Sequence, residues 1–144
     1  MKPAIWRYFS LAIFLSLTLV AFKAQGQPDD QHPTTIEIAQ LPRFCWGPLK
    51  VRDAVGPEFN MPSAGECGWG MNHYCAGLVD LMRVKRAPKK QDRLFWLGMA
   101  DANVRYTENS MKDYPNCSVR EHVAASRAEV NGLMLTYGVR PKPQ

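Results

Sequence analysis

Residues 67–88 read CGWGMNHYCAGLVDLMRVKRAP, and this stretch decides the fold of the chain. Its apolar side chains recur at intervals of three and four residues, which is the spacing of one face of an α-helix. Pro88 cannot continue a helix, because its ring removes a backbone donor and clashes with the preceding turn. The stretch therefore predicts a helix over residues 70–87. The residues that form the pattern are Met71, Cys75, Leu78, Leu81 and Met82.

Two further helices are expected downstream, over residues 91–113 and 118–137, each with apolar residues at helical spacing. Ser118 and Glu121 have the spacing of a capping box, in which each side chain satisfies a free backbone amide at the start of a helix. The connections are short, so consecutive helices should pack antiparallel. The sequence thus predicts an all-α fold of about three antiparallel helices. The side chains expected to pack between them are Leu78, Leu81, Leu97, Val104, Val123, Val130 and Leu133.

The segment before the first helix has a different composition. Residues 41–66 contain four prolines and three glycines, a density that excludes a long helix. They also hold apolar side chains, so we expect an extended N-terminal arm that lies on the helices and is pinned by Cys45 and Trp46. Residues 27–40 are polar, and we expect them to form a disordered lead-in.

The first 26 residues have the pattern of a signal peptide. Lys2 and Arg7 precede an apolar run, and Ala24-Gln25-Gly26 places small residues where a signal peptidase reads them. The apolar run is about 15 residues, shorter than the roughly 20 that span a bilayer, although an uncleaved anchor is the alternative. We expect cleavage before Gln27, no membrane span in the mature chain, and a periplasmic or secreted bacterial protein.

The mature chain has nearly balanced charge. Three of the 18 basic residues lie in the predicted signal peptide, which leaves 15 basic and 13 acidic side chains and a net charge of +2. This balance argues against nucleic acid as a partner. The mature length suits one domain, which we place at residues 41–138, followed by a tail over residues 139–144.

An even number of cysteines in an exported chain favours disulfides. Cys67 precedes the first predicted helix and Cys117 follows the second, so an antiparallel hairpin brings them together. Cys67 and Cys75 are eight residues apart, or roughly 12 Å along a helix, and a disulfide needs Cα atoms within about 7 Å. The predicted pairs are therefore Cys67 with Cys117 and Cys45 with Cys75, the second stapling the arm to the first helix.

The densest part of the first helix also carries a family resemblance. His73-Tyr74-Cys75, followed by Gly77-Leu78 and Arg86-Ala87, resembles the first helix in a group of secreted bacterial proteins with tetratricopeptide-like (TPR-like) helical hairpins. The resemblance covers about residues 70–113. It implies a helical scaffold for contacts with other proteins and no known chemistry.

Four side chains of this stretch are candidate metal ligands, namely Cys67, Met71, His73 and Cys75. Thiolate and thioether sulfurs suit Cu(I), and an exported protein could handle copper. The alternative is that Cys67, Met71 and Cys75 form an ordinary buried stripe, since they lie four residues apart on one face. No cofactor motif accompanies them, so no cofactor is expected.

Neither histidine of the helical region is expected to act in catalysis. His73 and His122 are candidate bases, but the sequence has no Gly-x-Ser-x-Gly elbow and no His-Glu-x-x-His motif. His122 falls on the apolar face of the third helix, which is typical of a hydrogen-bonded core histidine. We therefore do not expect an enzyme. The aromatic side chains Trp46 and Trp69 are expected to be buried under the arm.

The turn between the first two predicted helices carries the one basic cluster of the mature chain. Cations near the C-terminal end of a helix are favoured by its dipole, so a solvated turn explains them, and a site for an anionic partner or a lipid headgroup is the alternative. The best interpretation is a protein–protein interaction module with this cluster as a contact surface, and an unidentified envelope or extracellular protein as partner. The cluster consists of Arg83, Lys85, Arg86, Lys89, Lys90 and Arg93.

Overall fold

The structure is a computed structural model that describes residues 32–49 and 56–141. The predicted signal peptide and the first part of the predicted lead-in, residues 27–31, lie outside the described residues. The described residues contain helices and no strand, which confirms the all-α prediction. None of their helices is both long enough and apolar enough to cross a membrane.

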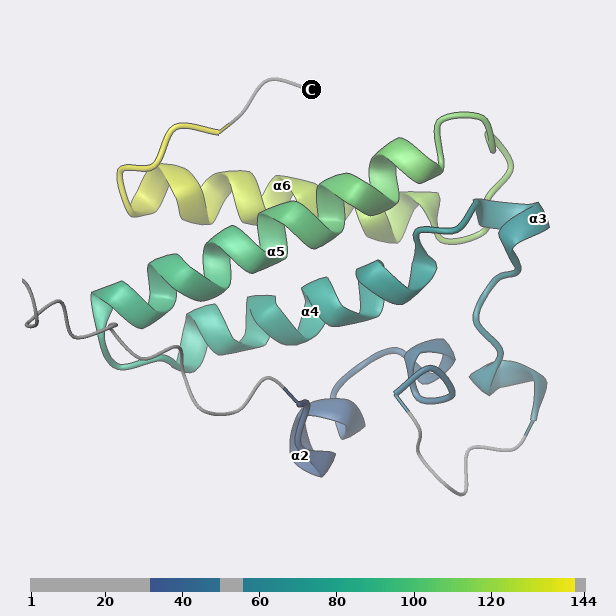
Figure 1. Ribbon diagram of the computed structural model, residues 1–144, viewed down its shortest axis with the longest axis horizontal. Coiled ribbons are helices and arrows are strands. Elements are labelled where there is room, and N and C mark those ends of the chain that lie inside the picture. Colours follow the sequence, from purple (N-terminus) through teal and green to yellow (C-terminus); the bar gives the residue numbers. More distant parts are fainter. Residues whose placement is uncertain (1–31, 50–55, 142–144) are drawn as a thin grey trace, which may run out of the picture. The chain divides into compact units, whose positions relative to one another are not determined.

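The three predicted helices are present as α4 (Met71–Arg86), α5 (Lys90–Ser110) and α6 (Arg120–Thr136). Consecutive helices run antiparallel, and α5 lies between α4 and α6 (Figure 1). Ala87, which caps α4, has the extended conformation that the following proline imposes on its neighbour. The α5 helix ends at Ser110, three residues before the predicted end, because the chain turns there toward Cys117, which is bonded to Cys67.

The predicted capping box at the start of α6 is wrong. Val119 is the residue that precedes the helix, and no side chain caps its first turn. The Ser118 hydroxyl instead donates to Oε1 of Glu66 at 2.7 Å, so it ties the start of α6 to the segment before α4. Because α6 begins at Arg120, Ser118 lies one residue before the capping position, and its hydroxyl does not face the free amides of the first turn.

The apolar core lies where the three helices meet. Five of the seven side chains predicted to pack there are buried, and Leu78 and Leu133 are partly buried. Tyr74 and Met71 are the two largest side chains that are fully enclosed. Gly77 lets α4 approach α5 closely, because a Cβ at this position would lie 3.2 Å from Cβ of Asn103.

Buried ion pairs join α5 to α6. Arg127 donates to Oδ1 of Asp101 at 2.7 Å and to Oε2 of Glu108 at 2.7 Å, and Arg105 also pairs with Asp101. Burial opposes ionisation of Asp101, but the hydrogen bonds from Arg105 and Arg127 outweigh it and hold the pKa of this carboxyl below its usual range. The ionised network is satisfied by its own members, as a buried charge requires.

The segment before α4 contains short helices and is less extended than predicted. They are α2 (Thr35–Ala39), η2 (Arg43–Cys45), η3 (Pro57–Phe59) and α3 (Ala64–Cys67). The prediction of a disordered lead-in is therefore wrong for α2, which begins with a complete capping box between Thr34 and Glu37.

Glu37 anchors α2 to α4 through a buried ion pair. Nε of Arg83 donates to Oε1 of Glu37 at 2.9 Å, and both side chains are more than nine-tenths buried. Arg83 also donates to the carbonyl of His32 at 2.8 Å and lies over the ring of Trp96. The hydrogen bonds from Arg83 lower the pKa of Glu37 from 4.5 to about 2.

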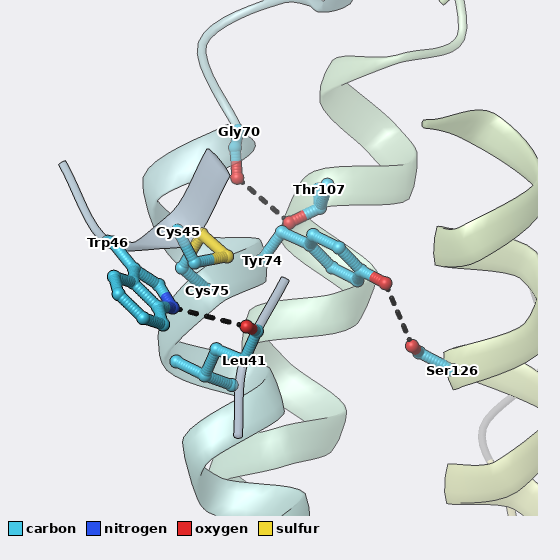
Figure 2. The surroundings of a disulfide bond; sticks show 8 residues. All are labelled: Leu41, Cys45, Trp46, Gly70, Tyr74, Cys75, Thr107 and Ser126. Atoms are coloured by element: carbon cyan, nitrogen blue, oxygen red, sulfur yellow. Dashed lines mark hydrogen bonds between the residues drawn. A yellow bond between two sulfur atoms is a disulfide. The ribbon is translucent and has the colours of Figure 1, made fainter. Parts of the chain in front are cut away.

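Both predicted disulfides are confirmed. Cys67 pairs with Cys117 across a Cα distance of 4.8 Å, and Cys45 pairs with Cys75 across 5.4 Å. Figure 2 shows Cys45 joined to the side of α4, with the Trp46 indole donating to the carbonyl of Leu41 at 3.2 Å.

The turn before α4 displays Trp69 to solvent, so the prediction that Trp69 is buried is wrong. Its side chain is 80% exposed, whereas Trp46 is partly buried as part of the arm. Gly68 has φ 77°, and a Cβ there would lie 2.3 Å from the carbonyl oxygen of Ser110. The close approach of this turn to the end of α5 therefore requires glycine, and it directs the following indole outward.

Candidate functional site

A groove of about 300 Å³ lies between α4 and α6, and residues of the N-terminal arm line its edge. Apolar side chains of α4 line it, namely Leu78, Leu81 and Met82. We call this feature the α4–α6 groove. The α6 wall is formed by His122, Ala125, Ser126 and Glu129.

Tyr74 closes the inner end of the groove. Its ring is buried, and its hydroxyl shares a hydrogen bond of 3.1 Å with Oγ of Ser126 (Figure 2). Burial raises the pKa of the Tyr74 phenol, so the hydroxyl stays protonated at neutral pH and serves as a structural link. This bond sets the separation of α4 and α6 at one end of the groove.

The N-terminal arm forms part of the groove wall. Leu41 and Pro42 line it, and Leu41 is 7% exposed because it packs against α4 beside Val79. Phe44 stacks on Tyr74 with ring centroids 6.3 Å apart. The contact of Leu41 with α4 thus shows that the apolar face of α4 accepts a side chain from another segment.

The six residues of the predicted basic contact surface have different environments in the structure. Arg83 points inward to Glu37 and is only 8% exposed, so it is not a surface contact. Lys85 pairs with Glu129 at 2.5 Å across the groove, and Arg86 donates to Oε1 of Gln40 at 2.6 Å. The sequence could not separate these roles, because the groups that pair with Arg83, Lys85 and Arg86 are 40 or more residues away.

Lys89 and Lys90 are the outward-facing members of the cluster. Both are exposed, and neither forms an ion pair within the described residues. Arg93 is half-buried and donates to the carbonyl of Ala87 at 2.5 Å, which holds the turn. Arg86 and Arg93 bond only neutral oxygens, so within the described residues no ion pair balances these two guanidinium groups or Lys89 and Lys90. Lys85, which lines the α4–α6 groove, lies four residues before Lys89 in the sequence.

The four candidate metal ligands do not share one environment. Cys67 and Cys75 are in separate disulfides, so neither offers a thiolate. Met71 is 1% exposed in the core, and Nδ1 of His73 is 2.9 Å from Oδ1 of Asn103. The chemistry of the cysteines therefore does not support the copper-type alternative, and the described residues contain no cluster of three or more His, Cys, Asp or Glu side chains that could hold a metal.

Asn103 links His73 to a buried carboxylate. Its amide nitrogen donates to Oδ2 of Asp80 at 2.9 Å, so its oxygen accepts from Nδ1 of His73. Burial raises the pKa of Asp80 to about 6, and Asn103 is the hydrogen-bond donor that supports its ionised form. The ring of His73 lies against Tyr106, with centroids 4.2 Å apart. This arrangement joins α4 to α5 and fixes one tautomer of the imidazole.

The prediction that His122 is a core residue is wrong. His122 is exposed and lines the α4–α6 groove, because α6 is rotated so that Val123, Ser126 and Val130 face the core. Sequence reasoning also missed Ala125 and Glu129 as groove residues. Their only signal was their position beside the apolar stripe of α6, which does not show what lies opposite.

No family model, curated protein or solved structure is detectably similar to this chain.

Proposed function

We propose that the protein is an exported interaction module whose α4–α6 groove binds a segment of another envelope or extracellular protein. The observation that carries the proposal is the groove itself, with an apolar wall on α4, polar groups on α6, and Leu41 and Pro42 of the chain's own arm along its edge. A groove of this kind suits an amphipathic segment, whose apolar side chains anchor it and whose polar groups fix its register.

The partner segment has a defined chemistry in this proposal. Its apolar side chains contact Leu78 and Met82, and acidic residues at one end face Lys89 and Lys90 beyond the groove. Charges at the edge of an interface act mainly on association rate and on salt dependence. The apolar contacts then supply most of the affinity.

The TPR-like resemblance supports the same assignment. In the proposal, α4 and α5 form the helical hairpin, and α6 provides the opposite wall of the groove as the first helix of a following pair would. The two disulfides and the predicted signal peptide support export. N-terminal sequencing of the exported protein tests this part, and the expected first residue is Gln27.

Site-specific photo-crosslinking tests the groove. A crosslinker at His122, which is exposed and lines the groove, should capture a partner from an envelope extract, whereas one at Ala128, exposed on the same helix outside the lining, should not. Ala125→Trp fills the groove and should abolish capture, and Ala128→Trp is the matched control. Equal capture from both positions, or capture that survives Ala125→Trp, would contradict the proposal.

Charge reversal tests the turn separately. Lys89→Glu together with Lys90→Glu should slow association at low salt and have little effect at high salt. Lys112→Glu with Arg140→Glu is the control, because these exposed residues lie elsewhere and the net charge changes equally. Lys85 is left intact, because its reversal would also break the pair with Glu129.

A further inference from the structure

A second cavity lies between the C-terminal part of α5 and the first turns of α6. Its volume is about 300 Å³, and its inner wall includes the buried side chains of Met111 and Val123. We call it the α5–α6 cavity. Four charged side chains surround its mouth, namely Arg105, Glu108, Lys112 and Arg120.

The acidic group at this cavity is already neutralised from within the fold. Glu108 accepts from Nε of Arg127 at 2.7 Å, and Arg127 also bonds Asp101, which pairs in turn with Arg105. Two carboxylates and two guanidinium groups therefore balance one another. The charge that faces the cavity beyond this network comes from Lys112 and Arg120.

Arg120 is held at the mouth without a counter-charge. One of its terminal nitrogens donates to the carbonyl of Met111 at 2.6 Å and to that of Tyr114 at 2.8 Å. These carbonyls fix the side chain but carry no formal charge. Lys112 is exposed and has no ion pair within the described residues. The cavity thus combines an apolar wall with two uncompensated cations.

We propose that the α5–α6 cavity binds a carboxylate attached to a short apolar group. The carboxylate lies against Lys112 and Arg120, and the apolar group packs on Ala124 above the buried side chains of Met111 and Val123. Guanidinium groups recognise carboxylates with charge-assisted hydrogen bonds. The volume is at the lower end of the range for ligand pockets, so the apolar group is small. This inference is independent of the α4–α6 groove.

Nuclear magnetic resonance titration of the mature chain tests the chemistry. Hexanoate should give saturable shifts at the methyl groups of Val123 and Ala124, and hexanamide, which has the same tail without the charge, should bind about tenfold more weakly. Inorganic phosphate should bind more weakly than hexanoate because it has no tail. Equal binding of hexanoate and hexanamide, or no saturable shift with hexanoate, would overturn the proposal.

Variants locate the site. Ala124→Glu places a carboxylate at the mouth and should abolish hexanoate binding, whereas Ala128→Glu, one turn further along the exposed side of α6, should leave it unchanged. Lys112→Gln should weaken binding about two- to fivefold, as expected for one exposed ion pair. Circular dichroism confirms that each variant is folded. Equal loss in both glutamate variants would place binding elsewhere.

The ligand's source is resolved by a second pair of probes. A short peptide ending in leucine with a free carboxylate is compared with its C-terminal amide and with hexanoate. Tighter binding of the free-acid peptide than of hexanoate identifies a polypeptide C-terminus as the ligand, and the reverse order identifies a small organic acid. Binding of the peptide amide as tightly as the free acid would contradict the role of the two cations.

Discussion

Helices α4, α5 and α6 and the preceding segment, residues 32–49, are held in place by different means. The three helices share a continuous apolar core, so their stability is distributed over many contacts. The preceding segment has a small apolar cluster around Leu41 and Cys45, and it depends on a few discrete links. Those links are the Cys45–Cys75 disulfide and the Glu37–Arg83 ion pair.

The two regions should therefore respond differently to the loss of a single contact. A helix of five residues such as α2 is not stable by itself, because the free-energy cost of nucleation exceeds the stabilisation from its few hydrogen bonds. Loss of one link should therefore release the preceding segment while the helices persist. Loss of a core contact should instead lower the stability of the whole domain.

Removal of the Cys67–Cys117 disulfide should have the largest effect. Replacing both residues by Ser opens a loop of 50 residues, and chain entropy gives a loss of about 4 kcal/mol in the free energy of unfolding. The loss should be global, as measured by chemical denaturation. The matched variant with Cys45 and Cys75 replaced should lose amide protection mainly in residues 32–49. The same pattern of lost protection in both variants would remove the distinction between the two regions.

Shortening a core side chain should lower the stability of all three helices together. Leu81 is 2% exposed, so Leu81→Ala should lower the free energy of unfolding by about 2–5 kcal/mol. Leu135, which is 69% exposed on α6, provides the control, and Leu135→Ala should change stability little. Denaturation curves measure both. A change at Leu81 as small as that at Leu135 would mean that the faces of α4 are wrongly assigned.

Acid should release α2 before the helices unfold. The pKa of Glu37 is lowered from 4.5 to about 2, so its stabilisation is complete above pH 4.5 and is lost as the pH falls through 2. The expected local loss is on the order of 3 kcal/mol. Amide protection of Ile38 between pH 5 and 2 measures it. Glu37→Gln should lack this pH dependence, and an unchanged profile in that variant would assign the effect to another group.

Neutralising Asp80 should stabilise the helices. Burial raises its pKa from 3.8 to about 6, so the folded protein holds this proton more tightly than the unfolded chain does, and stability is lost as the pH rises from about 4 through 6. Asp80→Asn should therefore raise the free energy of unfolding at pH 7 by on the order of 2 kcal/mol, a gain that disappears below pH 4. Asp113→Asn, at an exposed site, is the control. A loss of stability at pH 7 would show that the charge on Asp80 is needed.

The helices and the disulfides could be predicted because their signals are local or follow from simple geometry. Apolar periodicity located α4, α5 and α6, and the antiparallel hairpin explained the pairing of Cys67 with Cys117. The capping boxes show where this reasoning ends. Thr34 and Glu37 form one, whereas the same pattern at Ser118 does not, because α6 begins one residue later, after Val119, and the Ser118 hydroxyl bonds Glu66 instead. Only the tertiary structure brings that competitor close.

The candidate surfaces were less predictable, because they depend on which residues of different helices face each other. Arg83 and Lys89 belong to one basic cluster in the sequence, yet one is buried against Glu37 and the other is exposed. Trp69 is apolar enough for a core, but the close packing of its flanking glycines against α5 directs it to solvent. A single sequence does not contain these distances.

The connectivity of the two disulfides has a consequence for how the chain matures. Along the sequence the bonds interleave, since Cys67 lies inside the loop closed by Cys45 and Cys75, while its own partner, Cys117, lies outside it. During export from the N-terminus, Cys45 and Cys67 are the first two cysteines to be exposed to oxidation. These two do not pair with each other in the native fold. The native bonds therefore require either delayed oxidation, until α4 and α5 have formed, or reshuffling by thiol–disulfide exchange.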